Sequence, residues 1–210
     1  GILGSGWQAV TQLQAACAVR DIQNIKVFSP NQGHRVTFAQ EMNDLLGCEV
    51  SPVNSVENCV ADVDIVMCGS NSIEAIFFER WLRPGLHVSS IKMPEIEEAV
   101  LRKADVVALH YGQRRPDTIL AAGVNPPDRR SGTGWAVNEE FDFDSCPKLP
   151  EFIAGEKIGR TDDSQSTCFI NDMGLGLQFA SAAGLAYHKA KAASLGNELP
   201  TDWFTEDVHP

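Results

Sequence analysis

The chain has 210 residues, of which 43% are hydrophobic and 21% are charged, a balance typical of a globular protein with one large domain. Its formal net charge of -11 argues against a nucleic-acid partner, because there is no basic patch to neutralise phosphates. The sequence contains neither a run as long as a membrane span nor a basic-then-apolar segment resembling a signal peptide, so we expect a cytoplasmic protein without a membrane partner.

Short β-branched runs alternate with helix-like stretches from residue 1 to about 110. We expect strands at 2–3, 24–29, 48–53, 64–69, 86–91 and 105–110, with helices between them at 7–20, 34–47, 55–63 and 95–104. In the second helix Val36, Ala39, Met42 and Leu46 recur at helical spacing, and Gly47 is placed to end it. Apolar strands that alternate with helices predict a parallel sheet covered on both faces, a Rossmann-like doubly wound α/β fold.

The later part of the chain has a different character. Residues 111–165 are rich in Pro, Gly, Asp and Arg, which predicts long connections with at most short helices. A strand is expected again at 166–172 and an Ala-rich helix at 175–194. We therefore expect a Rossmann-like domain over 1–165 with long late loops, and a C-terminal strand and helix over 166–210 that belong to a second, incomplete domain.

Six cysteines are scattered without a C-x-x-C pair, and several lie in apolar runs. Neither a metal site nor a disulfide framework is indicated by such spacing. We expect all six to be small hydrophobic residues in a reducing compartment.

The segment "GSGWQA" (4–9) follows an apolar strand and opens a helix, as a dinucleotide-binding turn requires. Gly4 allows the tight turn, Gly6 allows backbone to approach a pyrophosphate, and the small Ala9 allows helix and strand to pack closely. The unpaired N–H groups of the helix start would face the phosphates. Trp7 and Gln8, inside the motif, are predicted to contact the cofactor as well. The alternative is a glycine turn in an unrelated α/β fold.

The ribose end of the predicted site has no acidic side chain. An Asp or Glu that binds the 2′-hydroxyl of NAD is expected about 20 residues after Ala9, but that position is Ser29, and Asn31 and Arg35 follow. A hydroxyl, an amide and a cation favour the 2′-phosphate of NADP(H) over NAD(H). Arg35 could equally be a solvated residue of the following helix.

A polar loop follows the strand at 64–69 and is expected to line the cofactor. Gly69, Ser70 and Asn71 are the candidates, since ligands of open α/β sheets bind beyond the carboxyl ends of the strands. An ordinary polar loop is the alternative.

Taken together, these residues resemble the ornithine cyclodeaminase and mu-crystallin family. The opening "GSGWQA" resembles its G-x-G-x-Q turn, and "ADVDIVMCGSNS" (61–72) its strand and polar loop beside the nicotinamide. Three later segments also resemble family segments, in the expected order: "ERWLRPGLHVSSI" (79–91), "LPEFIAGEKIGR" (149–160) and "STCFINDMGLGLQFASAAGLAYHKA" (166–190).

The resemblance implies an NAD(P)-dependent oxidoreductase that passes hydride between nicotinamide and the Cα of an amino acid or a cyclic imine, acting as a homodimer. Members carry about one further half-domain ahead of the glycine turn, which binds substrate and packs with the C-terminal helix. We therefore expect the chain to be a fragment that begins inside the first strand. A non-catalytic NADP(H)-binding protein of the mu-crystallin type is the alternative.

One family feature is not found. The family stretch with a catalytic Asp corresponds here to "SSIKMPEIEE" (89–98), which has no Asp, and Glu95 matches the second acidic residue of that stretch. Lys92 and His110, each expected near the carboxyl end of a strand, are the remaining candidates for moving a proton. An exposed lysine and a hydrogen-bonded structural histidine are the plainer alternatives.

Overall fold

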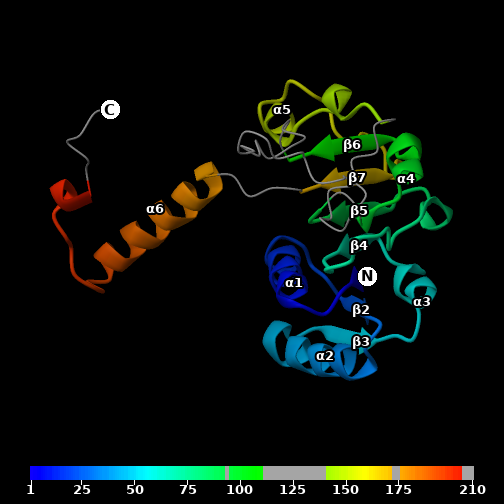
Figure 1. Ribbon diagram of the computed structural model, residues 1–210, viewed down its shortest axis with the longest axis horizontal. Coiled ribbons are helices and arrows are strands. Elements are labelled where there is room, and N and C mark those ends of the chain that lie inside the picture. Colours follow the sequence, from blue (N-terminus) through cyan, green and yellow to red (C-terminus); the bar gives the residue numbers. More distant parts are fainter. Residues whose placement is uncertain (93–94, 111–140, 172–175, 205–210) are drawn as a thin grey trace, which may run out of the picture. The chain divides into compact units, whose positions relative to one another are not determined.

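The computed structural model describes residues 1–92, 95–110, 141–171 and 176–204 (Figure 1). The chain divides into two compact units, Gly1–Met173 and Gly174–Pro210. Within the described residues, no helix is long and apolar enough to cross a membrane.

In its described residues, the first unit is built on one sheet of seven parallel strands. These strands are β1 (Ile2–Leu3), β2 (Asn24–Phe28), β3 (Glu49–Pro52), β4 (Ile65–Cys68), β5 (His87–Ser90), β6 (Val106–Leu109) and β7 (Thr167–Ile170). Their order in the sheet is β3-β2-β1-β4-β5-β7-β6. The chain runs outward from β1 to β3 and then returns to the other side of β1 with β4, which confirms the predicted Rossmann-like fold.

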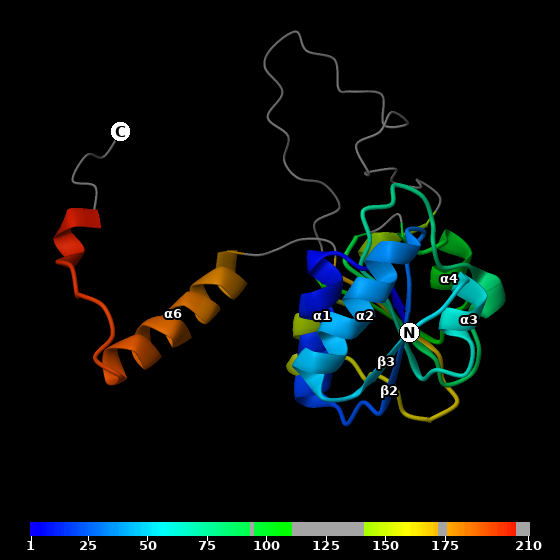
Figure 2. The same ribbon diagram turned by 90° about the horizontal axis from the view of Figure 1, so that it is seen from below.

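Helices cover both faces of this sheet (Figure 2). The helices α1 (Trp7–Val19) and α2 (Gln32–Leu46) lie on one face, and α3 (Val56–Val60) and α4 (Glu98–Lys103) lie on the other. Gly47 ends α2 in the left-handed conformation (φ 68°), where glycine is favoured, as the sequence predicts. The observed element ends differ from the predicted ones by a few residues.

Two hydrophobic clusters fill the two sides of the sheet. Neighbouring strand residues point to opposite faces, so Ile2 belongs to the cluster under α1 and α2 and Leu3 to the other. Likewise Met67 lies in the first cluster, whereas Val66 and Cys68 lie in the second. Strands buried on both faces explain why these segments read as continuous apolar runs.

The position of β7 corrects the predicted domain boundary. The sequence predicts that the 166–172 strand belongs with the C-terminal helix, but Thr167–Ile170 pairs with both β5 and β6 inside the sheet. Of the predicted long connections, 111–140 lie outside the described residues. The rest contains a 3-10 turn, η3 (Phe143–Ser145), and a short helix, α5 (Leu149–Ile153).

The described part of the second unit contains α6 (Gly176–Ala192) and a 3-10 turn, η4 (Thr201–Phe204). Glu198 ties the segment after α6 to the helix, because its carboxylate accepts hydrogen bonds from Lys191 Nζ and the Tyr187 hydroxyl, both at 2.7 Å. Phe179 and Leu185 of α6 are exposed.

All six cysteines are free thiols, and Cys59, Cys68, Cys146 and Cys168 are buried. Burial raises the pKa of Cys168 to about 12. These thiols pack as small hydrophobic residues, as predicted.

Candidate functional site

A pocket of about 620 Å³ opens at the carboxyl ends of β1, β2 and β4. This is where the order of the strands reverses, the usual place for a ligand in an open α/β sheet. The pocket is lined by Leu3, Gly4, Ser5, Gly6, Trp7, Gln8, Phe28, Ser29, Pro30, Asn31, His34, Val56, Gly69, Ser70, Asn71, Ser72 and Ile76.

The glycine turn is held in a shape that requires glycine at its first position. Gly4 has a φ of 133°, and a Cβ atom there would lie 2.3 Å from the carbonyl oxygen of Gly69. A Cβ on Gly69 would in turn lie 3.5 Å from the Cα of Ala9. The close approach of the turn after β1 to the end of β4 therefore requires glycine at position 4, whereas a Cβ at position 69 would make an ordinary contact with the start of α1.

The N-terminus of α1 is left open. Gly6 is its N-cap residue, there is no side-chain hydrogen bond to the cap, and the first turn has no acidic residue. A Cβ on Gly6 would have no atom within 4 Å, so the approach to the helix start is clear. By contrast, Asn31 caps α2 by accepting a hydrogen bond from the His34 N–H at 3.0 Å. The free amides and positive end of α1 suit an anionic group such as a pyrophosphate.

Trp7 and Gln8 stand at the opening of the pocket. Both are exposed, and the Trp7 side chain is 92% accessible. Their position at the start of α1 brings them to the same open helix end as Gly6.

The end of β2 presents hydroxyl and amide groups to the pocket. The Ser5 hydroxyl donates to the Ser29 hydroxyl at 2.9 Å and so joins the glycine turn to β2. Arg35 does not line the pocket. Its side chain is buried and donates to the Ser29 carbonyl at 3.0 Å and to Asn54 Oδ1 at 2.9 Å. The structure thus places Arg35 behind Ser29, rather than on the pocket wall where the sequence-based hypothesis expects it.

The loop after β4 forms the opposite wall. Gly69, Ser70 and Asn71 line the pocket, with Ser72 beside them. Ser70 is held in place by Glu95, because the N–H and the hydroxyl of Ser70 both donate to Glu95 Oε1 at 2.6 Å.

The two candidate proton-transfer residues lie outside the pocket lining. Lys92 is half-buried just beyond β5, and its N–H donates to the Ser90 hydroxyl at 3.1 Å. His110 is buried at the end of β6, the edge strand, where its N–H donates to the Ile170 carbonyl at 2.8 Å. Two strands, β5 and β7, separate β6 from β4. Lys92 follows β5 and His110 follows β6, and β7 lies between these two strands, so the two residues follow strands that are not neighbours.

Some residues of the pocket are not predicted from the sequence. The apolar Val56 and Ile76 line the pocket, although no motif marks them. The link between Ser70 and Glu95 also carries no sequence signal, because the two residues are 25 positions apart. For Ser5 a signal exists, since it lies between the two glycines and beside the end of the neighbouring strand.

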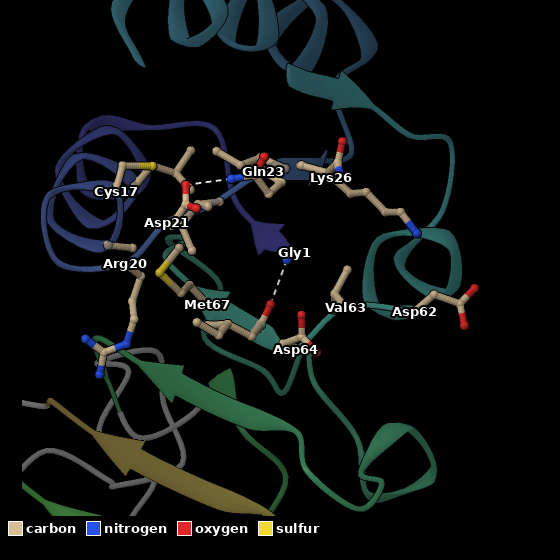
Figure 3. A pocket seen from close by; sticks show the side chains of 16 residues that line it. Gly1, Cys17, Arg20, Asp21, Gln23, Lys26, Asp62, Val63, Asp64 and Met67 are labelled. Atoms are coloured by element: carbon tan, nitrogen blue, oxygen red, sulfur yellow. Dashed lines mark hydrogen bonds between the residues drawn. The ribbon is translucent and has the colours of Figure 1, made fainter. Parts of the chain in front are cut away.

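A second, smaller pocket of about 320 Å³ lies at the opposite, amino ends of β1, β2 and β4 (Figure 3). Its lining includes Gly1, whose amino group donates to the Ile65 carbonyl at 2.7 Å. Lys26 at its rim is engaged with the Ala61 carbonyl at 2.7 Å. The C-terminal end of α1 faces this pocket, so the helix does not offer its free N–H groups there as it does in the larger pocket.

Comparison with known proteins agrees with the fold. Delta(1)-pyrroline-2-carboxylate reductase from Bacillus cereus is 24% identical over 203 residues, which cover 94% of this chain and 59% of that protein. The same enzyme from Thermococcus litoralis, solved in complex with NADH and L-proline, is 28% identical with a TM-score of 0.76 and covers 95% of this chain and 60% of that one. An archaeal alanine dehydrogenase dimer with bound NAD, 22% identical with a TM-score of 0.72, shares the fold over 95% of this chain and 59% of that one.

The chain thus spans about three fifths of the length of these relatives. The model of the ornithine cyclodeaminase/mu-crystallin family matches residues 1–194. By this match over nearly its whole length, the chain belongs to the ornithine cyclodeaminase/mu-crystallin family.

Proposed function

We propose that the chain binds a nicotinamide dinucleotide, NAD(H) or NADP(H), in the pocket beside Gly4 and Gly6. The observation that carries this proposal is the open N-terminus of α1, which has neither a capping side chain nor an acidic residue and faces a pocket of about 620 Å³. The solved relative with 28% identity contains NADH.

The chain's own residues have distinct tasks in this proposal. Gly6, Trp7 and Gln8 place the start of α1 against the pyrophosphate, and Gly4 gives the turn the shape that allows this approach. Ser29 and Asn31 face one end of the dinucleotide, and Gly69, Ser70 and Asn71 form the opposite wall. Arg35 acts from behind by fixing the Ser29 carbonyl.

The choice between the two dinucleotides is left to measurement. The NADP(H) preference predicted from Ser29 and Arg35 gains no support from the solved relatives, which contain NADH or NAD. It is weakened further because the Arg35 guanidinium is already engaged by two acceptors.

We further propose that the complete protein is an oxidoreductase that acts at the Cα of an amino acid or a cyclic imine. A bound nicotinamide supplies or takes up the hydride in such a reaction. Lys92 is the candidate for holding the proton, since it follows β5, the neighbour of β4, whereas the edge position of His110 makes it the weaker candidate. A homodimer and a cytoplasmic location stay predictions.

Substitution of Gly6 tests the binding site. In Gly6→Ala the added methyl group meets no protein atom, so the fold should be kept, but it would stand between the start of α1 and the pyrophosphate. We expect the Kd for NADH and NADPH, measured by fluorescence titration, to rise at least tenfold, equivalent to about 1.4 kcal/mol.

Gly159→Ala is the matched control. Its methyl group would make only an ordinary contact, 3.7 Å from Phe152, and Gly159 does not line the pocket. This variant should bind both dinucleotides like the wild type. Equal binding by Gly6→Ala and the wild type, or no binding by the wild type, would refute the proposed site.

A second candidate function is a dinucleotide-binding protein without turnover. The observation in its favour is the lack of an Asp in residues 89–98, the stretch where the family's catalytic Asp is expected. Absorbance of the reduced nicotinamide, followed with a panel of cyclic imines and amino acids, separates the two functions. For the complete protein, tight NADH or NADPH binding without consumption across the panel supports the binding protein, and consumption supports the enzyme. Loss of that consumption in Lys92→Ala would support the role of Lys92, and unchanged consumption would reject it.

A further inference from the structure

Glu95 is a buried acidic residue for which the proposed function has no task. It lies between β5 and α4, and its side chain is 0% exposed. Burying a carboxyl group is costly unless hydrogen bonds compensate for the lost water. The groups that contact Glu95 therefore indicate what it does.

The carboxyl group of Glu95 joins the ends of two neighbouring strands. Oε1 accepts hydrogen bonds from the N–H and the hydroxyl of Ser70, just beyond β4, both at 2.6 Å. Oε2 lies 3.0 Å from the hydroxyl of Ser90, the last residue of β5. The Ser90 hydroxyl also accepts the N–H of Lys92 at 3.1 Å, so the turn that carries Lys92 is tied to the same cluster.

The main chain of Glu95 holds the other end of the segment that begins at Ser70. Its carbonyl oxygen accepts the N–H groups of Ile76 and Phe77, at 2.8 and 3.0 Å. Residues 70–77 follow β4, and both ends of this segment are therefore hydrogen-bonded to one residue, Glu95. Ser70, Ser72 and Ile76 of this segment line the pocket.

We propose that Glu95 is a positioning residue that fixes residues 70–77 as a wall of the dinucleotide pocket. The inference rests on the proposed function. Glu95 does not itself line the pocket and acts through Ser70. Holding Ser70 in place also restrains Ser72, because the Ser70 hydroxyl accepts the Ser72 N–H at 3.0 Å.

Two measurements on the 210-residue chain test this role. The first is amide hydrogen exchange at residues 70–72 without dinucleotide, and the second is the Kd for NADH. In Glu95→Ala the Ser70 N–H and hydroxyl lose their acceptor, so exchange should become at least tenfold faster and the Kd should rise about tenfold. Glu95→Gln keeps an oxygen that can accept both bonds and should restore most of the wild-type exchange and affinity.

Glu97→Ala is the matched control. The Glu97 side chain accepts the Glu79 N–H at 2.7 Å, outside the 70–77 segment, so this variant loses a comparable bond elsewhere. Exchange at 70–72 and the Kd for NADH should stay at wild-type values. Equal effects of Glu95→Ala and Glu97→Ala would mean general destabilisation and would overturn the proposal, as would a folded Glu95→Ala with unchanged exchange.

Two further outcomes are misfolding of Glu95→Ala and a wild-type protein that does not bind NADH. If Glu95→Ala does not fold, Ser70→Ala removes one of the two bonds, and unchanged exchange at Ser72 in that variant would overturn the proposal. If wild-type protein does not bind NADH, the proposed function fails. Wild-type-like exchange in Glu95→Ala would then reject the positioning role as well, whereas faster exchange would keep it as a property of the segment alone.

Discussion

His87 illustrates how one polar side chain is accommodated inside the sheet. It lies in β5, where its Nδ1 is 2.7 Å from the hydroxyl of Thr167 on the neighbouring β7. Burial lowers the pKa of His87, and the positive charges of Arg160 and Arg20 lower it further. The imidazole is therefore neutral in the folded protein over a pH range in which an exposed histidine takes up a proton.

This lowered pKa predicts a loss of stability in mild acid. As the pH falls below about 6.5, the unfolded chain binds a proton at His87 and the folded chain does not, so the free energy of unfolding decreases. The decrease has a limiting slope of about 1.4 kcal/mol per pH unit and ends at the lowered native pKa. Urea unfolding between neutral and mildly acidic pH should show this slope in the wild type and lack it in His87→Asn.

The exposed His34 provides the control, since His34→Asn should keep the wild-type slope. An identical pH dependence in all three proteins would assign the acid sensitivity to other groups.

Asn43 shows how an element at the edge of the sheet is completed. β3 is an edge strand, and the N–H and carbonyl of Val50 would otherwise lack partners there. Asn43 of α2 supplies both: its Oδ1 accepts the Val50 N–H, and its Nδ2 donates to the Val50 carbonyl, each at 2.9 Å. One amide side chain thus covers an open strand edge that could pair with another chain.

Removal of this amide should weaken β3. We expect Asn43→Ala to reduce the free energy of unfolding by about 2 kcal/mol, because two hydrogen bonds to Val50 are lost. Denaturant unfolding measures the change, and light scattering measures aggregation through the uncovered edge. Gln40→Ala, at an exposed position of the same helix, should change stability by less than about 0.5 kcal/mol. Similar losses in the two variants would contradict the role given to Asn43.

Sequence reasoning succeeds where the signal is local. The turn at Gly4 and Gly6, the helix end at Gly47 and the alternating strands and helices each depend on neighbouring residues, and the structure contains them. Sequence reasoning misses features that depend on residues far apart in the chain. Arg35 lies behind Ser29 because Asn54, 19 residues away, accepts one of its N–H groups. The order of β7 and β6 has no local signal, since each strand would be equally apolar in either place.

At the scale of the whole molecule, the two units differ in how they are stabilised. Every described residue of the two core clusters belongs to Gly1–Met173. In Gly174–Pro210, by contrast, the apolar side chains of Phe179, Leu185 and Trp203 are exposed. The first unit therefore contains the side chains needed for its own cooperative folding.

A chain shortened to residues 1–173 should consequently keep its fold and its binding site. We expect its Tm to lie within about 3 °C of the 210-residue chain, a difference of less than about 1 kcal/mol, and its Kd for NADH to be unchanged. Calorimetry and fluorescence titration provide the two values. Loss of the cooperative transition on truncation would show that the first unit depends on the C-terminal residues.

The insertion of β7 between β5 and β6 has a consequence for biosynthesis. His87 and Thr167 are adjacent in the sheet but 80 residues apart in the chain, so β5 has no partner on one side until that later segment has left the ribosome. During this interval the nascent chain exposes an apolar strand edge, a feature that makes folding intermediates prone to aggregation. Among the described strands, the one synthesised last is thus the one that joins β5 to β6.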